Sequence, residues 1–531
     1  MGRSGMARMV PVLCLALVAA CSADHSVRAT RSVEVGSVDS VPAPSTSAAD
    51  EPSPPETSPP TTAPPTAPPT VPQSTPPSTE PTVPPGGLVP NGDGVGDQLF
   101  PDLGNPGIDV LDYALDLTYD RDADSIAGSV TLTMQITDER GELTLDSSGP
   151  EVSSVTVDGV DARYVEDDPE LRITPAATLH AGDVVEVRVE YSVVPSFDDG
   201  DIIPSGWFNT PAGSYVLNEP DGASSWLPSN DHPSDKATWT FEITVAPGAT
   251  AVANGALVSS TDGPDGATWV WREDDPMPTY LMLLVTGDYE IVEGTTPDGL
   301  PLVSAVLRSD RQRAQPYLDS LDDQIDFFDD WFGPFPLDRY GIAITDSFGG
   351  LAMETQGRSL FSRDDLNGDS GPLQELLLSH ELAHQWFGDA VSPLQWRDIW
   401  LNESFATYGQ WMWLEHVQQG TVEGEAERSL DGRLAQRGNP TGSPDADDLF
   451  GFNSYDGGAV VLHALRRTIG DDHFFDLLQR WVAENTGTSR STQDFIALAE
   501  EVSGTDLEEF FDDWLFATKL PSAYPSAPAG Q

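Results

Sequence analysis

The residues best suited to chemistry lie in the run HELAH, from His380 to His384, and at Glu403. Two histidines spaced i, i+4 on a helix share one face, with Cβ atoms about 5–6 Å apart, so both imidazoles can bind one metal ion. The 18 residues between His384 and Glu403 allow a first helix to end at Gly388 and a second one to begin. The sequence therefore predicts one zinc ion held by His380, His384 and Glu403, with the open position of a catalytic site.

Glu381 lies too far round the same helix to bind this ion, but its carboxylate can accept a proton from a zinc-activated water. We therefore predict Glu381 as the general base. The segment from Trp400 to Ala406 has a helical pattern, so Glu403 can point toward the first helix. The alternative is a surface carboxylate beside two core histidines. The chain has only 8 histidines, and two of them fall in this motif, which favours the metal site.

Three further groups of motifs accompany the zinc residues. They are MPTYL at 277–281 with GDY at 287–289, GPFP at 333–336, and AMETQ at 352–356. With the zinc residues, they resemble the gluzincin zinc aminopeptidases of the membrane alanyl aminopeptidase and leukotriene hydrolase family, over about residues 109–521. The resemblance implies a zinc metallopeptidase that hydrolyses N-terminal residues from peptides.

The resemblance also implies an oxyanion donor and substrate contacts. Tyr455, in the run YDGGA, resembles the tyrosine that stabilises the oxyanion in this family. An aminopeptidase must bind a free ammonium, and Glu354 matches the family's amine-binding glutamate. Glu219, in the run EPDGA, resembles a second carboxylate for the same purpose. The remaining expected substrate contacts are Met353 and the backbone amides of Gly350 and Leu351.

The apolar pattern divides the folded part into two domains. Residues 106–297 alternate with period two in several runs, which predicts an N-terminal β-sheet domain. Residues 298–521 predict a thermolysin-like α+β domain, with a helix over 311–331 and a short strand at 341–345 before the zinc helices. Residues 522–531 are left as a tail. The large helical C-terminal domain of longer family members finds no counterpart here, so we expect a more open site.

The N-terminus predicts export. Arg3 and Arg8 precede an apolar run over 9–20 that is too short to span a bilayer, so residues 1–20 read as a signal peptide. The run VAAC resembles a lipoprotein cleavage box, with Cys21 as the lipidated residue; an ordinary signal peptide in which Cys21 is incidental is the alternative. Residues 21–105 are predicted to be a disordered Pro/Ser/Thr-rich linker.

The charge excludes one class of partner. Basic residues number 26 and acidic residues 86, which gives a net charge of −60 and argues against nucleic acid. We expect peptide substrates, a monomer, and contact with a membrane only through a lipid on Cys21. The predicted location is the outer face of a bacterial cell membrane, or the medium. Two alternatives stay open: a zinc endopeptidase with an open cleft, and a non-catalytic binding lipoprotein at the cell surface.

Overall fold

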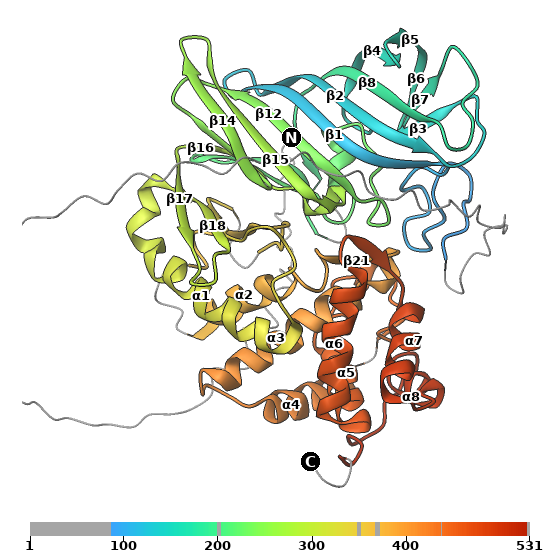
Figure 1. Cartoon of the computed structure of the whole chain (residues 1–531), viewed down its shortest axis with the longest axis vertical. Coiled ribbons are helices and arrows are strands. Elements are labelled where there is room, and N and C mark those ends of the chain that lie inside the picture. The colour runs from blue at the N-terminus through green and yellow to red at the C-terminus, as the bar shows by residue number, and fades with distance from the viewer. Residues whose placement is uncertain (1–86, 199–202, 348–351, 367–371, 437, 528–531) are drawn as a thin grey trace, which may run out of the picture. The chain divides into compact units, whose positions relative to one another are not determined.

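A computed structural model of the chain describes residues 87–198, 203–347, 352–366, 372–436 and 438–527, which belong to the compact unit Val83–Gln531 (Figure 1). The predicted signal peptide, Cys21 and most of the predicted linker lie outside the described residues, as do Gly350 and Leu351. Among the described helices, none combines the length and the apolar composition needed to cross a bilayer.

An eight-stranded sheet forms the frame of the N-terminal domain, in the order β14-β15-β12-β1-β2-β8-β4-β5. The predicted alternation is present in β1, β2, β8 and β12, where roughly every second side chain is buried. The strands are β1 (Ile108–Asp120), β2 (Ser125–Ile136), β4 (Glu151–Val157), β5 (Val160–Asp161), β8 (Val184–Val193), β12 (Ala237–Val245), β14 (Ala256–Gly263) and β15 (Gly266–Met277).

Two smaller sheets complete this domain. The first has the order β13-β16-β11-β10-β9 and the second the order β3-β7-β6. One continuous apolar core joins them to the large sheet. Their strands are β3 (Leu143–Asp146), β6 (Arg163–Asp167), β7 (Glu170–Thr174), β9 (Phe197–Asp198), β10 (Ser205–Asn209), β11 (Gly213–Leu217), β13 (Thr250–Ala253) and β16 (Leu284–Gly287).

The second domain carries the predicted zinc ligands, and we refer to it as the catalytic domain. It combines a four-stranded sheet, in the order β17-β18-β19-β20, with helices around a second apolar core. The strands are β17 (Tyr289–Thr295), β18 (Pro301–Leu307), β19 (Ile342–Thr345) and β20 (Ser359–Ser362), with a separate pair β21 (Val391–Pro393) and β22 (Thr488–Arg490). The helices are α1 (Arg311–Phe332), α2 (Pro372–Ala383), α3 (Trp400–His416), α4 (Val422–Ala435), α5 (Asp456–Ile469), α6 (Asp471–Asn485), α7 (Thr492–Ser503) and α8 (Glu508–Trp514).

The two sheet systems divide between β16 and β17, ahead of the boundary that the sequence predicted after residue 297. The reason is that β17 pairs antiparallel with β18, so it completes the sheet of the catalytic domain. The predicted helix over 311–331 and the predicted strand at 341–345 correspond to α1 and β19. The strands gather in the upper half of Figure 1 and the helices in the lower half.

The residues just before β1 pack against the folded body, although the sequence placed them in the disordered linker. Asp97 is only 2% exposed. One of its carboxylate oxygens accepts hydrogen bonds from the backbone amides of Leu99 (2.7 Å) and Phe100 (3.0 Å). The other accepts from the amide of Trp396 at 2.8 Å and lies 3.2 Å from Nε2 of His232. Asp97 therefore fastens this segment to both domains.

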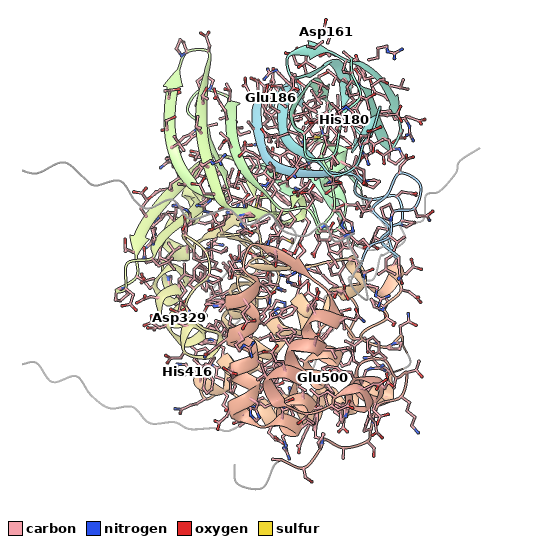
Figure 2. All side chains as sticks on the ribbon, turned by 45° about the vertical axis from the view of Figure 1, so that its right-hand side comes forward. Asp161, His180, Glu186, Asp329, His416 and Glu500 are labelled. Carbon is pink, nitrogen blue, oxygen red and sulfur yellow. The ribbon has the colours of Figure 1, made fainter. Side chains whose placement is uncertain are left out.

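The predicted tail also begins too early. Tyr524 donates a hydrogen bond to the carbonyl of Ala426 on α4 at 2.8 Å, and its ring stacks on Trp514 with 5.6 Å between centroids. The catalytic domain therefore extends past residue 521. Charged side chains project outward around both domains, as Figure 2 shows for Asp161 and Glu186 among others, in keeping with the net charge of −60.

Candidate active site

Helix α2 carries His380 and ends at Ala383, so His384 lies in the turn directly after it and the helix does not reach the predicted Gly388. After Ala383 the backbone tightens: the amides of Gln385 and Trp386 donate to carbonyls three residues earlier, at 3.1 and 3.2 Å. The amide of His384 still donates to the carbonyl of His380, so both imidazoles stay on one face. Gly388, with φ +132°, follows, and its amide donates to the carbonyl of Val391 at 3.0 Å.

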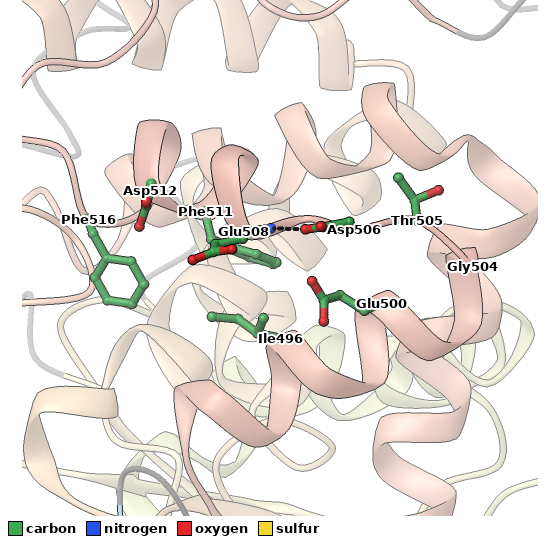
Figure 3. A pocket seen from close by; sticks show the side chains of 9 residues that line it. All are labelled: Ile496, Glu500, Gly504, Thr505, Asp506, Glu508, Phe511, Asp512 and Phe516. Atoms are coloured by element: carbon green, nitrogen blue, oxygen red, sulfur yellow. Dashed lines mark hydrogen bonds between the residues drawn. The ribbon is translucent and has the colours of Figure 1, made fainter.

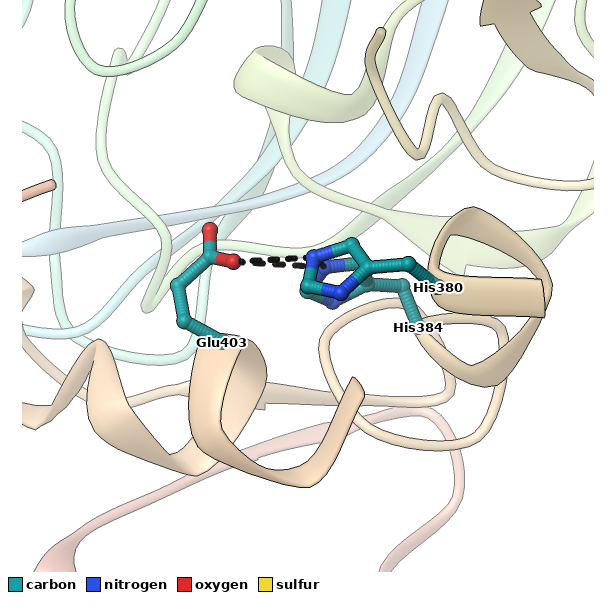
Figure 4. A group of neighbouring side chains, drawn as sticks. All are labelled: His380, His384 and Glu403. Atoms are coloured by element: carbon teal, nitrogen blue, oxygen red, sulfur yellow. Dashed lines mark hydrogen bonds and ion pairs between the residues drawn. The ribbon is translucent and has the colours of Figure 1, made fainter. Parts of the chain in front are cut away.

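The three predicted metal ligands converge. Nε2 of His380 and Nε2 of His384 are 3.2 Å apart, and each lies 3.4 Å from the same carboxylate oxygen of Glu403 on α3 (Figure 4). Atoms that bind a tetrahedral zinc ion at about 2.0–2.2 Å lie roughly 3.3–3.6 Å from one another. The two nitrogens and the oxygen therefore fit a zinc ion in both spacing and chemical type.

A backbone contact sets the orientation of His384. Its Nδ1 lies 3.1 Å from the carbonyl oxygen of Phe387, which can only accept a hydrogen bond. In the neutral imidazole the proton therefore sits on Nδ1, which leaves Nε2, on the side of Glu403, to bind a metal ion. Metal-binding histidines commonly have such a partner on the ring nitrogen that does not touch the ion.

The charges around the histidines favour a cation. Burial lowers the pKa of His384, but the carboxylates of Glu354 and Glu403 outweigh burial and raise it well above its ordinary value. Burial raises the pKa of Glu403, and the two histidines reverse this and lower it to about 2. For His380, burial is the larger effect and lowers the pKa. Buried carboxylates thus surround a position that takes positive charge.

Glu381 lies beside the predicted ligands without joining them. It is 5% exposed, and one of its oxygens lies within 4.8 Å of a ring nitrogen of His384 and an oxygen of Glu354. Burial raises the pKa of Glu381 well above its ordinary value; His384 opposes this shift and the carboxylate of Glu354 adds to it. Glu381 therefore lies beside the predicted ligands, where a general base must lie.

The two predicted amine-binding carboxylates come together from different domains. Glu219 and Glu354 are 5% and 3% exposed, and each offers an oxygen within 4.8 Å of the other and of Glu403. Among the described residues, Oε1 of Glu219 and Oε1 of Glu354 have no hydrogen-bond partner. Burial raises the pKa of both, and the charge of Glu354 raises that of Glu219 further. Buried acceptors without donors are costly, so this pair suits a ligand with several N–H groups.

Two further predicted residues, Tyr455 and Met353, lie near this group. Tyr455 is the half-buried residue before α5, and its ring lies beside His380. Met353 is 4% exposed, and its backbone exchanges hydrogen bonds of 2.9 and 2.7 Å with Leu360. A short β-bridge thus holds the backbone of Met353, one residue before Glu354.

Sequence reasoning missed the buried polar residues that hold these elements. Gln385 donates to the carbonyl of Glu354 at 3.0 Å and accepts from the amide of Gly357 at 2.7 Å. Nζ of Lys236, from the β domain, donates to the carbonyl of Asp389 at 2.6 Å. The position of Gln385 directly after HELAH was a usable signal, whereas nothing in the sequence pointed to Lys236.

A surface hollow between α7 and α8 lacks this chemistry (Figure 3). It is lined by Glu500, Asp506, Glu508 and Asp512, with Phe511 and Phe516 among its apolar walls. Asp506 accepts a hydrogen bond from the amide of Glu508, the first residue of α8, at 3.1 Å. These side chains belong to the local structure of the α7–α8 turn.

Comparison with known proteins identifies the family. Residues 110–281 match the peptidase M1 N-terminal domain, and residues 317–514 match the peptidase family M1 domain. The chain is 26% identical to "Probable aminopeptidase 2" of Sulfurisphaera tokodaii over 72% of its own length, and it spans 51% of the length of that relative.

Two similar crystal structures cover most of the chain. A mutant two-domain M1 zinc metallopeptidase bound to L-tryptophan is 31% identical, with a TM-score of 0.74, and the match covers 81% of this chain and 99% of that one. A mutant M1 zinc metallopeptidase from Deinococcus radiodurans, bound to a Tyr-Ser-Ala substrate, is also 31% identical, with a TM-score of 0.73 and the same coverage. With both domains matched in order and a shared architecture, the chain belongs to the peptidase M1 family of zinc metallopeptidases.

Proposed function

We propose that this protein is a zinc-dependent aminopeptidase that removes residues from the N-termini of peptides. The observation that carries the proposal is the pair of buried carboxylates, Glu219 and Glu354, next to the metal-binding group. Oε1 of each, which has no hydrogen-bond partner among the described residues, can accept the N–H groups of a free α-ammonium, which would place the first peptide bond of a substrate beside Glu381. A curated relative named as an aminopeptidase supports the same activity.

Each residue of the site has a separate role in the proposed reaction. His380, His384 and Glu403 would hold the zinc ion, which when bound supplies a Lewis acid for the scissile carbonyl and a lower pKa for water. Glu381 takes the proton from the attacking water and delivers it to the leaving amine. The hydroxyl of Tyr455 donates a hydrogen bond to the oxygen on which negative charge develops.

The decisive experiment measures metal content and turnover together. The purified protein should contain one zinc per chain and hydrolyse aminoacyl-anilides and unblocked peptides, while N-acetylated versions of the same compounds stay intact. The variant Glu381→Gln should keep its zinc and lose about 10²–10⁴-fold in turnover, the usual contribution of a general base. Equal cleavage of free and acetylated peptides would show an endopeptidase, and absence of turnover with zinc bound would show a binding protein.

We also propose that the enzyme acts outside the cytoplasm, held to the membrane by a lipid on Cys21. The run VAAC at residues 18–21 supports this, since it resembles a lipoprotein cleavage box. The sequence also holds no cysteine after Cys21, so Cys21 would be the one cysteine left after cleavage. A radiolabelled fatty acid should enter the parent protein and not the variant Cys21→Ala, which should appear in the medium. A Cys21→Ala protein that stays in the membrane fraction would contradict the proposal.

A further inference from the structure

Tyr280 of the β domain links the turn after α2 to the first turn of α3, two segments next to the predicted zinc ligands. It lies in the short 3₁₀ turn Thr279–Leu281 and is 1% exposed. Its hydroxyl donates a hydrogen bond to the carbonyl of Gly388 at 3.1 Å and accepts one from Nδ2 of Asn402 at 3.2 Å. One hydroxyl group therefore contacts the turn after α2 and the first turn of α3.

Both contacts lie one residue away from groups that orient the metal site. Gly388 follows Phe387, whose carbonyl holds the Nδ1–H of His384. Asn402 precedes Glu403 in the chain. Any shift of the Gly388 carbonyl or of the Asn402 side chain would therefore pass to His384 or to Glu403 through a single backbone link.

The space between the two helices leaves little room for such a shift. A Cβ atom placed on Gly388 would lie 3.2 Å from Nδ2 of Asn402 and 3.3 Å from Nδ1 of His384. The hydroxyl of Ser392 donates to the same carbonyl of Gly388 at 2.6 Å. The ring of Tyr280 packs edge-to-face on Trp396, with 5.2 Å between the ring centroids.

We propose that Tyr280 is a positioning residue for the zinc site, through which the β domain fixes the relative placement of His384 and Glu403. The inference rests on the proposed zinc-dependent function. Partners of metal ligands typically change metal affinity by about 10–100-fold when they are removed. Because Tyr280 acts one step further out, the effect should be near the lower end, about tenfold.

Tyr280→Phe tests the proposal, with Tyr289→Phe as the matched control. Tyr289 is also 1% exposed, and its hydroxyl donates one hydrogen bond, to Oγ1 of Thr345 at 2.8 Å, away from α2 and α3. Loss of the Tyr280 hydroxyl should speed zinc release into excess chelator about tenfold. It should also change the visible absorption of the Co²⁺-substituted protein. The control should lose comparable thermal stability and change neither readout.

Asn402→Ala supplies a second route, because it removes the other partner of the Tyr280 hydroxyl. It should also speed zinc release, and the double variant should fall short of the product of the single effects, since both changes break one network. If Tyr280→Phe does not fold, Asn402→Ala decides alone. Zinc release at the parent rate from either folded variant would overturn the positioning role, whereas a parent protein that binds no zinc would overturn the proposed function with it.

Discussion

The ring of Tyr455 lies nearly parallel to the imidazole of His380, with 5.9 Å between the ring centroids and 17° between their planes. Tyr455 is half-buried, while His380 is only 8% exposed. The phenol is therefore the more exposed of two rings that lie side by side next to the predicted metal site. A donor in this position suits the role that we propose for Tyr455 in binding the oxyanion.

Tyr455→Phe should lower kcat about 10²–10³-fold, because removing one oxyanion donor usually costs that much. KM and zinc content should change little, since the hydroxyl contributes mainly in the transition state. Steady-state kinetics with an aminoacyl-anilide, together with metal analysis, check this. A variant that keeps kcat and loses only affinity would assign Tyr455 to substrate binding.

Glu354→Gln should weaken the binding of free amines, because it removes a negative charge from the predicted ammonium pocket. We expect KM for an aminoacyl-anilide to rise about 10–100-fold, the loss typical of a buried charged hydrogen bond of about 1.5–3 kcal/mol. Inhibition by a simple amine, measured as a Ki, should weaken in parallel. Parent-like KM and Ki values would place the ammonium elsewhere.

The raised pKa of Glu170 predicts that the free energy of unfolding of the protein depends on pH. This residue of β7 is 4% exposed, and burial and the charge of Asp93 raise the pKa of Glu170 from 4.5 to about 7. Above pH 4.5 the unfolded chain releases this proton while the folded protein keeps it, so the contribution of Glu170 to stability falls as pH rises to 7. At pH 8 the free energy of unfolding of the Glu170→Gln protein should therefore exceed that of the parent by about 1–3 kcal/mol, after allowance for solvent screening.

Denaturant unfolding of the Glu170→Gln protein at pH 4.5, 6 and 8 measures this difference. The gain over the parent should be smallest at pH 4.5, grow between pH 4.5 and 7, and stay level above pH 7. Glu186→Gln, on the exposed face of β8, separates the effect of burial from that of lost charge. A gain for Glu170→Gln that is the same at every pH would contradict the assignment.

Asp97→Ala should destabilise the folded unit by about 2–4 kcal/mol, because it leaves His232 and the amide of Trp396 without their buried partner. Asp93→Ala is the control. Its carboxylate pairs with Arg172 at the surface, and exposed pairs contribute about 0–1 kcal/mol. Thermal unfolding of the two variants compares them, and a loss for Asp97→Ala no larger than about 1 kcal/mol would show that the buried contacts of Asp97 add little stability.

Local patterns predicted much of the fold and the centre of the site. Alternation defined β1 and β12 because one face of each strand is buried. The spacing of His380 and His384 predicted their shared face because helical geometry is the same in every protein. Asp158 and Gly159, with φ of +51° and +71°, form the tight turn between β4 and β5, as an Asp-Gly pair typically does.

The remaining features depend on contacts between distant parts of the chain. Tyr280 meets Asn402 across 122 residues, and Asp97 meets Trp396 across 299. No periodicity records such contacts, because they arise only when one domain packs on the other. Glu219 was located by resemblance alone for the same reason. The early end of α2 reflects the tightened backbone at Gln385, which local propensity does not distinguish from a continuing helix.

Because the carboxylate of Asp97 is buried, the folded unit includes residues that precede β1. A protein that begins at Ile108, the first residue of β1, would retain every residue assigned to catalysis. It would nevertheless leave His232 and the amide of Trp396 without Asp97 as their partner. Trp396 lies four residues before α3, the helix that carries Glu403. Expression boundaries should therefore be set upstream of residue 97, and any loss of activity in shorter versions should first be sought in a loosened junction between the domains.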